Sequence, residues 1–377
     1  MTTSTVHHRA RASKIVARVA SGFFLLGLSA VGAQAAGCGA TFEPGRHELT
    51  IQSGGMERSA VYVIPSNYSG KRKVPLVFDF HGSNSNPQVQ LTRSHWDEVA
   101  EREGFIVMAL AGSLDGELPR THAWNVPGVT KTDGADDAAF IRDAVKVAKD
   151  TFCVDATKIY ASGYSGGGRM LSQYICSGFG DFSAAGFVMG LRAGTPEQEN
   201  GVWRPRRESC QPSRPVSIIA FSGMKDHVNP FDGGGKAYWR YGGEVALNRW
   251  AELNGCNGRP RVDDGEAAKV STYLDCRAGI SVMSYMITNA DHAWPARTVR
   301  FRLASNNGEE KIREVDATDR MWEFFRGSGG ELVAGAALKP DCPDEHNTAS
   351  LKEGGQGTQC SQPVKADSNA PSVSGDL

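Results

Sequence analysis

The pentapeptide Gly-Tyr-Ser-Gly-Gly at 163–167 constrains the fold more than any other part of the sequence. A stretch with strand character, 158–161, precedes it, and a helical stretch over 170–174 follows it. Glycines on both sides of a serine allow a sharp strand-to-helix turn that holds the hydroxyl clear of the backbone. The alternative is a glycine-rich loop with a solvated serine, but the flanking strand and helix favour the turn. This context indicates Ser165 as a nucleophile.

Strands and helices alternate along most of the chain. Apolar stretches with strand character occupy 60–64, 76–80, 106–110, 158–161, 187–189, 216–221 and 282–286. Apolar residues recur at helical spacing over 136–150, where Asp136 and Asp137 suit the start of a helix, and 321–325 predicts a closing helix. The alternation predicts an α/β fold with a mostly parallel central sheet and helices on both faces.

Composition divides the 377 residues into three parts. Residues 1–35 contain four basic residues and no acid, then an apolar run and Ala33-Gln34-Ala35, as in a secretory signal peptide. Residues 36–340 have the composition of one globular domain, the predicted catalytic domain. Residues 341–377 are of low complexity and lack aromatic residues, which predicts a mobile tail. We expect a protein secreted to the periplasm or beyond, without stable membrane insertion.

Charge and cysteine content narrow the partners and the compartment. Without the leader the chain has 37 basic and 42 acidic residues, a net charge of −5, which gives nucleic acid no electrostatic attraction. All eight cysteines follow residue 35 and predict disulfides in an exported chain. We expect the pairs Cys153–Cys176 and Cys256–Cys276. The unassigned cysteines are Cys38, for which lipidation is an alternative, Cys210, Cys342 and Cys360. No C-x-x-C occurs, so we expect no metal site.

A serine hydroxyl is a weak nucleophile until a neighbouring base removes its proton, so other segments must supply a histidine and an acid. After a catalytic serine turn of this kind, the acid and then the histidine follow along the chain. Asp226 comes directly after the stretch 216–221, and His292 comes after 282–286. Strand ends of this kind meet at one edge of a parallel sheet. The sequence therefore predicts Asp226 as the acid and His292 as the base, with Asp232 as the alternative acid.

Acyl transfer also requires backbone N–H donors directed at the oxyanion. We expect the amide of Gly166, next to the serine, and the amide of Ser83, in the loop after 76–80, to supply them. The alternative for His81-Gly82 in that loop is a turn with a packed histidine.

Four aromatic or imidazole side chains are candidates for contacting the substrate: His81, Trp124, Tyr164 and Trp294. A flat aromatic surface can hold a phenolic ring or an ester chain. Core packing is the alternative for both tryptophans.

Several of these segments, in their order along the chain, together resemble one family. They are Pro75 to Gly82, Trp124-Asn125, Asp136-Asp137, Val154-Asp155 with Ile159-Tyr160, Gly163 to Gly168, and His292 to Pro295. The chain from Cys38 to Phe325 resembles the secreted feruloyl esterases and polyhydroxybutyrate depolymerases. The resemblance implies an α/β-hydrolase fold, no cofactor, and the triad Ser165, Asp226 and His292. Ser83 and Ser222 depart from the family pattern, which often has cysteine and histidine there, but Ser83 keeps its backbone amide.

We therefore expect a secreted serine hydrolase that cleaves hydroxycinnamoyl (feruloyl-type) esters through an acyl-enzyme. The partner is an ester substrate, either a small molecule or attached to a polymer. A polyhydroxybutyrate depolymerase is the main alternative, although such enzymes commonly carry a substrate-binding module that the aromatic-free tail cannot supply. Further alternatives are an acetyl or general carboxylesterase, a peptidase or thioesterase with the same triad, and a catalytically silent cell-wall-binding module.

Overall fold

The computed structural model describes residues 1–2, 37–130, 134–296 and 315–327. The chain divides into two compact units, Met1–Leu332 and Val333–Leu377, and the described residues belong to the first. The expected signal peptide beyond residue 2, the expected tail at 341–377, and the two cysteines Cys342 and Cys360 lie outside the described residues.

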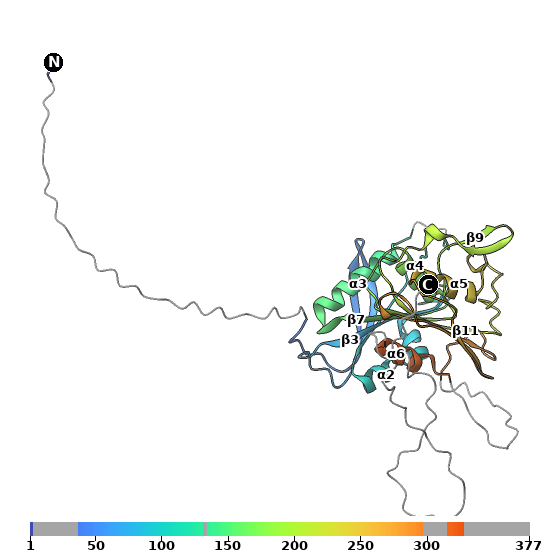
Figure 1. Cartoon of the computed structure of the whole chain (residues 1–377). Helices are drawn as coiled ribbons and strands as arrows, with labels where there is room; N and C mark the ends of the chain where they lie inside the picture. Colours follow the sequence, from blue (N-terminus) through green and yellow to red (C-terminus); the bar gives the residue numbers. More distant parts are fainter. Residues whose placement is uncertain (3–36, 131–133, 297–314, 328–377) are drawn as a thin grey trace, which may run out of the picture. The chain divides into compact units, whose positions relative to one another are not determined.

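A ten-stranded sheet forms the centre of the first unit (Figure 1). Its spatial order is β1-β2-β4-β3-β7-β8-β11-β14-β13-β12. The bounds are Gly45–Ser53 (β1), Met56–Ile64 (β2), Val74–Phe80 (β3), Ile106–Leu110 (β4), Val154–Tyr164 (β7), Ala184–Val188 (β8), Ser217–Gly223 (β11), Arg261–Asp264 (β12), Ala268–Tyr273 (β13) and Val282–Ile287 (β14). The six strands from β4 to β14 in this order are parallel, and the two at each edge are antiparallel. The predicted α/β fold with a mostly parallel sheet is confirmed.

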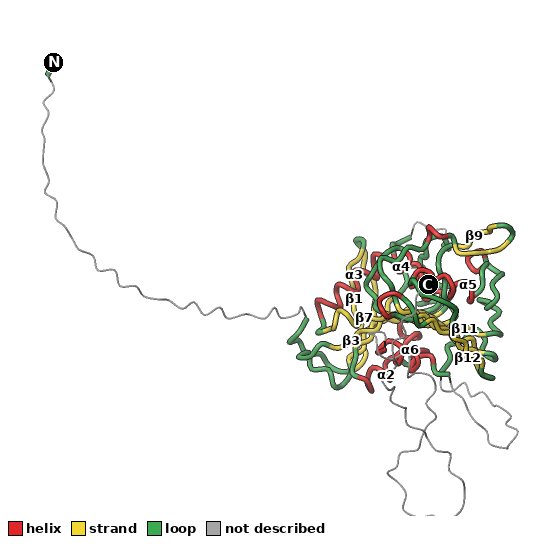
Figure 2. Tube along the Cα trace, viewed as in Figure 1, coloured by secondary structure: helices red, strands yellow, loops and turns green. Residues whose placement is uncertain are grey.

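Helices cover both faces of this sheet (Figure 2). The bounds are Pro87–Ser94 (α1), Trp96–Glu103 (α2), Asp137–Thr151 (α3), Gly166–Cys176 (α4), Gly243–Leu253 (α5) and Ala317–Gly327 (α6). Residues of α3, α4 and α5 share one buried apolar cluster, and residues of α1, α2 and α6 share the other. Two short hairpins lie outside the sheet, β5 (Leu114–Asp115) with β6 (His122–Ala123) and β9 (Pro196–Glu199) with β10 (Val202–Pro205).

Burial on both faces explains the apolar sequence of the central strands. Every residue of β4 is buried, and all but one residue of β3 is buried. A strand covered on both sides must be apolar at successive positions, so it lacks the alternation of a half-exposed strand. For this reason β4 has the same bounds, 106–110, as the stretch predicted from the sequence.

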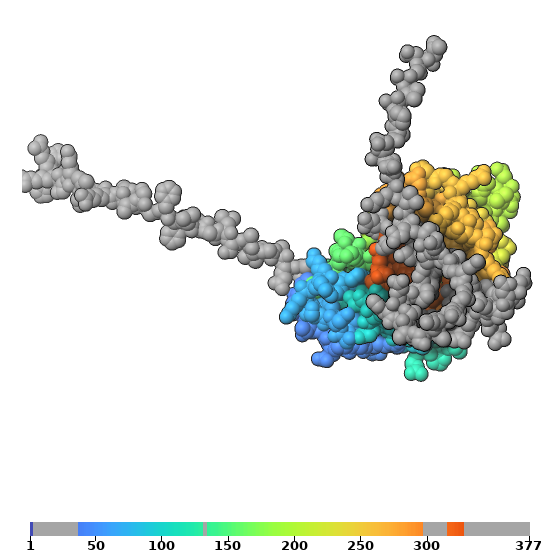
Figure 3. Space-filling model, turned by 60° about the horizontal axis from the view of Figure 1, so that its bottom comes forward, coloured from blue at the N-terminus to red at the C-terminus, as the bar shows by residue number. Residues whose placement is uncertain are grey.

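The closing helix α6 packs against α2, far from it in sequence; Figure 3 shows the surface of α6 in orange-red. The rings of Trp96 and Phe325 stack with centroids 6.0 Å apart. At the rim, the guanidinium of Arg102 pairs with the carboxylate of Asp319 at 2.7 Å. These contacts join the start and the end of the described chain on one face of the sheet.

Asp136 and Asp137 lie at the start of α3, as predicted from the sequence. The side chain of Asp136 caps the helix by accepting hydrogen bonds from the amides of Ala138 and Ala139. The carboxylate of Asp137 is buried and forms an ion pair of 2.5 Å with Arg58. Asp136 therefore serves the helix start, whereas Asp137 holds Arg58 and also accepts hydrogen bonds from Ser113 and Asn125.

Three disulfides correct part of the predicted pairing. They join Cys38 to Cys153, Cys176 to Cys210, and Cys256 to Cys276. The pair Cys256–Cys276 was predicted correctly, whereas the expected pair Cys153–Cys176 is wrong. Cys153 directly precedes β7 and Cys176 ends the helix that follows, so the two lie at separate places, and each bonds instead to a distant segment. Disulfides are typical of proteins in an oxidising compartment.

Candidate active site

Ser165 lies at the turn between β7 and α4. Its backbone has φ 49° and ψ −110°, a conformation that non-glycine residues rarely adopt. Such strain persists only where the surrounding structure enforces it, and it is the mark of a serine held at a strand-to-helix elbow. The amide of Ser165 donates to the carbonyl of Val188 on β8, which fixes the turn to the neighbouring strand. The predicted nucleophile therefore has the local geometry of one.

Glycines around Ser165 allow this turn to pack tightly. A Cβ on Gly163 would lie 2.8 Å from the carbonyl carbon of Gly167. A Cβ on Gly167 would lie 2.5 Å from the carbonyl oxygen of His81, at the end of β3. Both distances are too short for a side chain, so the first and last positions of the pentapeptide must be glycine.

Asp226 is held in the tight turn that follows β11. One carboxylate oxygen, Oδ1, accepts hydrogen bonds of 2.8 Å from the amides of Val228 and Asn229. Asp226 is only 4 % exposed, whereas the alternative acid, Asp232, is exposed. The turn leaves the second oxygen, Oδ2, directed at the loop after β14.

His292 lies in that loop and contacts both other residues. Its Nδ1 lies 2.7 Å from Oδ2 of Asp226, and its Nε2 lies 2.9 Å from Oγ of Ser165. A carboxylate can only accept, so Nδ1 carries the proton and Nε2 accepts from the serine hydroxyl. The structure thus brings together the three residues that the sequence selected, although they are up to 127 positions apart.

The two predicted oxyanion donors lie side by side. A Cβ built on Gly166 would come 3.0 Å from the backbone nitrogen of Ser83 and closer still to its hydroxyl. Gly166 begins α4, where the first amides of a helix have no acceptor within the helix. Ser83 is exposed in the loop after β3. The backbone nitrogen of Ser83 therefore lies close to Gly166, the residue next to Ser165.

Known proteins provide an independent comparison. No family model matches the chain. The chain is 30% identical over 242 residues to Feruloyl esterase B of Piromyces equi, a match that covers 63% of the chain and 42% of that protein. It is 26% identical over 264 residues to Probable feruloyl esterase C of Aspergillus flavus, covering 67% of the chain and 83% of that protein.

The chain is similar in sequence to these feruloyl esterases over 63% to 67% of its length. The expected resemblance is confirmed, and the names of these relatives agree with the predicted class of esterase. Among solved structures, an acetyl xylan esterase from Aspergillus awamori is similar with a TM-score of 0.49 and 13% identity, over 74% of this chain and 99% of that one.

Two of the predicted substrate contacts are instead buried. His81 is 0 % exposed, its Nδ1–H donates to the carbonyl of Gly82, and its Nε2 accepts from the amide of Gly112. Burial lowers the pKa of His81 to about 4, so the ring is neutral. Trp124 is 2 % exposed, stacks near His81 and donates to the carbonyl of that residue. Both side chains pack against the loop that carries Ser83. This agrees with the alternative interpretation, in which they are packed and do not contact substrate.

The other two candidates lie next to His292. Tyr164 donates from its phenol to the carbonyl of His292 at 2.7 Å, and burial raises the pKa of that phenol. Trp294 is 5 % exposed and donates from its indole nitrogen to the hydroxyl of Thr318 on α6. Its ring centroid lies 6.2 Å from that of Tyr164. Their polar atoms therefore hold the histidine loop in place, and their ring faces pack around it.

Two arginines near the site were not predicted from the sequence. Arg169 follows Ser165 by one helical turn, and its guanidinium lies 3.4 Å from the hydroxyl of Ser83. Arg192, in the loop after β8, is 6 % exposed. Arginine is common on surfaces. Among the described arginines, these two and Arg58 are buried, and of the three only Arg58 forms an ion pair with a described residue, Asp137.

Among the residues that the structure describes, no group of three or more His, Cys, Asp or Glu side chains is arranged to hold a metal ion. No helix in the same residues has the length and apolar character needed to cross a membrane.

Proposed function

We propose that this protein is a secreted serine esterase that hydrolyses hydroxycinnamoyl esters, with Ser165, His292 and Asp226 as its catalytic triad. The observation that carries the proposal is the continuous hydrogen-bonded chain from the Asp226 carboxylate, through the imidazole, to the Ser165 hydroxyl at the elbow. A buried acid, an oriented histidine and a serine in a strained turn form an arrangement suited to acyl transfer.

The proposed mechanism gives each residue a step. His292 Nε2 takes the proton of Ser165 as Oγ attacks the ester carbonyl, and the amides of Ser83 and Gly166 hold the oxyanion. The imidazolium then donates this proton to the departing alcohol oxygen, which leaves an acyl-enzyme. Water deprotonated by the same nitrogen cleaves the acyl-enzyme and restores the serine. Throughout, Asp226 keeps the proton on Nδ1 and stabilises the imidazolium.

The choice of acyl group rests on the relatives. The two proteins compared above are named feruloyl esterases, and the longer match covers 83% of one of them. A feruloyl group is a phenolic acid, but Tyr164 and Trp294 are buried beside the histidine, so the choice does not rest on them. The leader pattern and the three disulfides support export, where such esters occur.

The test compares the mature protein with its Ser165→Ala variant on methyl ferulate, p-nitrophenyl butyrate and amorphous polyhydroxybutyrate. We expect methyl ferulate to be the best substrate and the variant to lose about 10⁶-fold in kcat. Ser213→Ala, at an exposed serine, is the matched control and should retain wild-type rates. Preference for the polymer would favour a depolymerase, and equal rates for both alanine variants would refute the proposed triad.

A further inference from the structure

Arg169 and Arg192 are buried cations that have no anionic partner among the described residues. Arg169 is 9 % exposed and Arg192 is 6 % exposed. Arg169 has a 3.4 Å contact with the hydroxyl of Ser83 and lies 4.3 Å from the ring centroid of Tyr238. None of the ion pairs between described residues includes either guanidinium. Charges in a protein interior are normally paired, so this arrangement requires an explanation.

Arg192 is held rigidly in place. Its Nη2 donates to the carbonyl of Tyr241 at 2.9 Å. Its guanidinium lies 3.5 Å from the ring centroid of Tyr241 and 4.1 Å from that of Trp239. Aromatic faces stabilise a cation, but they leave its in-plane N–H donors free to bind a ligand.

Three buried nitrogens of these two guanidinium groups have no hydrogen-bond partner among the described residues: Arg169 Nε, Arg192 Nε and Arg192 Nη1. Burial lowers the pKa of Arg169. Tyr238 opposes this shift, and the positive charge of Arg192 adds to it, as expected for two cations near each other. Water could satisfy the donors but not the charge, whereas an anion would satisfy both.

Both arginines line a cavity of about 30 Å³, together with Tyr238, Ser172 and Gln173. This volume is far below that of ordinary small-molecule sites, so we assign to the cavity a group of the size of a carboxylate rather than a sugar ring. The cavity adjoins a larger recess of about 440 Å³, because both are lined by Gln173 and Thr195.

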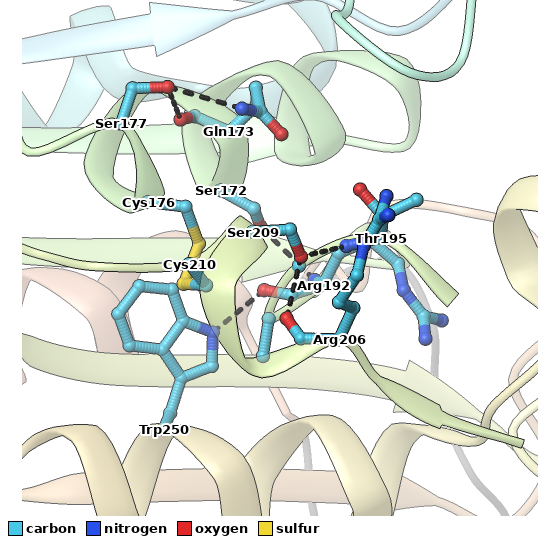
Figure 4. The surroundings of a disulfide bond; sticks show 12 residues. Ser172, Gln173, Cys176, Ser177, Arg192, Thr195, Arg206, Ser209, Cys210 and Trp250 are labelled. Carbon is cyan, nitrogen blue, oxygen red and sulfur yellow. Dashed lines mark hydrogen bonds between the residues drawn. A yellow bond between two sulfur atoms is a disulfide. The ribbon is translucent and has the colours of Figure 1, made fainter. Parts of the chain in front are cut away.

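The larger recess has polar walls that suit a sugar. Figure 4 shows Gln173 on α4 and Ser177 directly after the helix, with Thr195 and Ser209 on the segments across from them. Gln211 and the carboxylate of Glu208 complete its polar lining. Amides and hydroxyls can donate to and accept from sugar hydroxyls, and the volume lies in the range of small-molecule sites. Glu208 makes the outer end acidic, so an anionic group is favoured only at the arginine end.

We propose that the small cavity is a subsite for a carboxylate carried by the sugar part of the substrate, with the sugar ring in the larger recess. This inference rests on the proposed esterase function, because it assigns the recess to the alcohol side of the ester. Position supports it, since Arg169 contacts Ser83, and a Cβ on Gly166 would lie 3.4 Å from Arg169 Nη2. The subsite therefore begins beside the predicted oxyanion donors.

The first experiment measures binding to the full mature chain by titration calorimetry at constant ionic strength. The ligands are D-glucuronate, D-glucose and acetate. The carboxylate should add at least about tenfold to the affinity, since a hydrogen bond to a charged group contributes that much. We expect glucuronate to bind at least about tenfold more tightly than glucose and than acetate. Equal binding of glucuronate and glucose, or of glucuronate and acetate, would overturn the proposal.

Variants then locate the site. Arg192→Gln should weaken glucuronate at least about tenfold and leave glucose within about twofold, whereas Arg214→Gln, at an exposed arginine, should change neither. Because a change at Arg192 can impair folding, Gln173→Glu provides a second test at a half-buried position that both cavities share. The carboxylate that it introduces should also weaken glucuronate about tenfold. Unchanged glucuronate affinity in both variants would refute the location.

The binding assay needs no turnover, so it separates this inference from the proposed function. Hydrolysis of p-nitrophenyl butyrate is measured on the same samples. Glucuronate binding without hydrolysis would leave the subsite intact and refute the esterase, whereas hydrolysis without selective binding would refute only the subsite.

Discussion

The phenol of Tyr164 donates a hydrogen bond of 2.7 Å to the backbone carbonyl of His292. Tyr164 directly precedes the nucleophile, so this one bond connects the elbow to the loop that carries the proposed base. The distance between Ser165 and His292 is thereby set by the backbone near both residues as well as by their own contact.

Tyr164→Phe should loosen this connection while keeping the ring. We expect the free energy of unfolding to fall by about 1 kcal/mol and kcat to fall roughly tenfold, because the histidine is less precisely oriented. Tyr273→Phe is the matched control, since its phenol donates to Asn248 away from the site. Denaturant unfolding and turnover of p-nitrophenyl butyrate measure the two effects. A loss of stability without a loss of kcat would show that the bond has no part in orienting His292.

Asp226→Asn should lower kcat by about 10⁴-fold while the fold is retained. The amide can still accept from the turn, but its NH₂ group cannot accept the Nδ1 proton, so the wrong tautomer of His292 is favoured. Asp232→Asn, at the exposed alternative acid, serves as the control and should retain activity. If the two variants exchanged these results, Asp232 would be the acid.

Gly166→Ala should disturb the oxyanion donors. The added Cβ would lie 3.0 Å from the backbone nitrogen of Ser83 and closer to its hydroxyl, so the loop after β3 must move away. Loss of one donor costs about 10² to 10³ in kcat. Steady-state kinetics with a thermal melt would distinguish this loss from unfolding. Wild-type kcat in a folded variant would contradict the assignment of Ser83.

Two buried groups near the end of β3 make opposite contributions to the pH dependence of stability. Burial lowers the pKa of His81 to about 4, so between pH 6.5 and 4 the unfolded chain binds a proton that the folded chain does not, and acidification destabilises by up to about 3 kcal/mol. Burial raises the pKa of Asp79 to about 7 against the hydrogen bonds that lower it. The folded state therefore binds a proton first at Asp79, and acidification from pH 7 to 4 stabilises it.

Asp79→Asn should remove the second contribution and leave that of His81. We expect the variant to lose stability more steeply than the wild type as the pH falls from 7 to 4. Urea unfolding at a series of pH values measures this, and parallel pH profiles for the two proteins would contradict it.

The elements that were predicted correctly are those whose formation depends on residues close together in the sequence. The buried strand at 106–110 and the order Ser165, Asp226, His292 both follow from periodicity and from motif context. The edge strands β1, β12 and β13 were not predicted, because half-exposed antiparallel strands have weak apolar signals.

Properties that depend on distant contacts could not be predicted from the sequence. Cys153 bonds to Cys38 across 115 positions, whereas proximity in sequence suggested a different partner. His81 was expected to contact substrate, but only the folded chain reveals that it is buried with both nitrogens engaged. The charges of Arg169 and Arg192 become informative only once their burial is known.

The three disulfides of the described residues follow one another along the chain without crossing or nesting. Both cysteines of the pair Cys38–Cys153 precede Cys176 in the sequence, and both cysteines of the pair Cys176–Cys210 precede Cys256. Each bond can therefore close in the order in which a ribosome delivers its cysteines. The cysteines of this part of the chain can therefore be oxidised while the chain is still being synthesised. Each disulfide can form before the first cysteine of the next disulfide has been added.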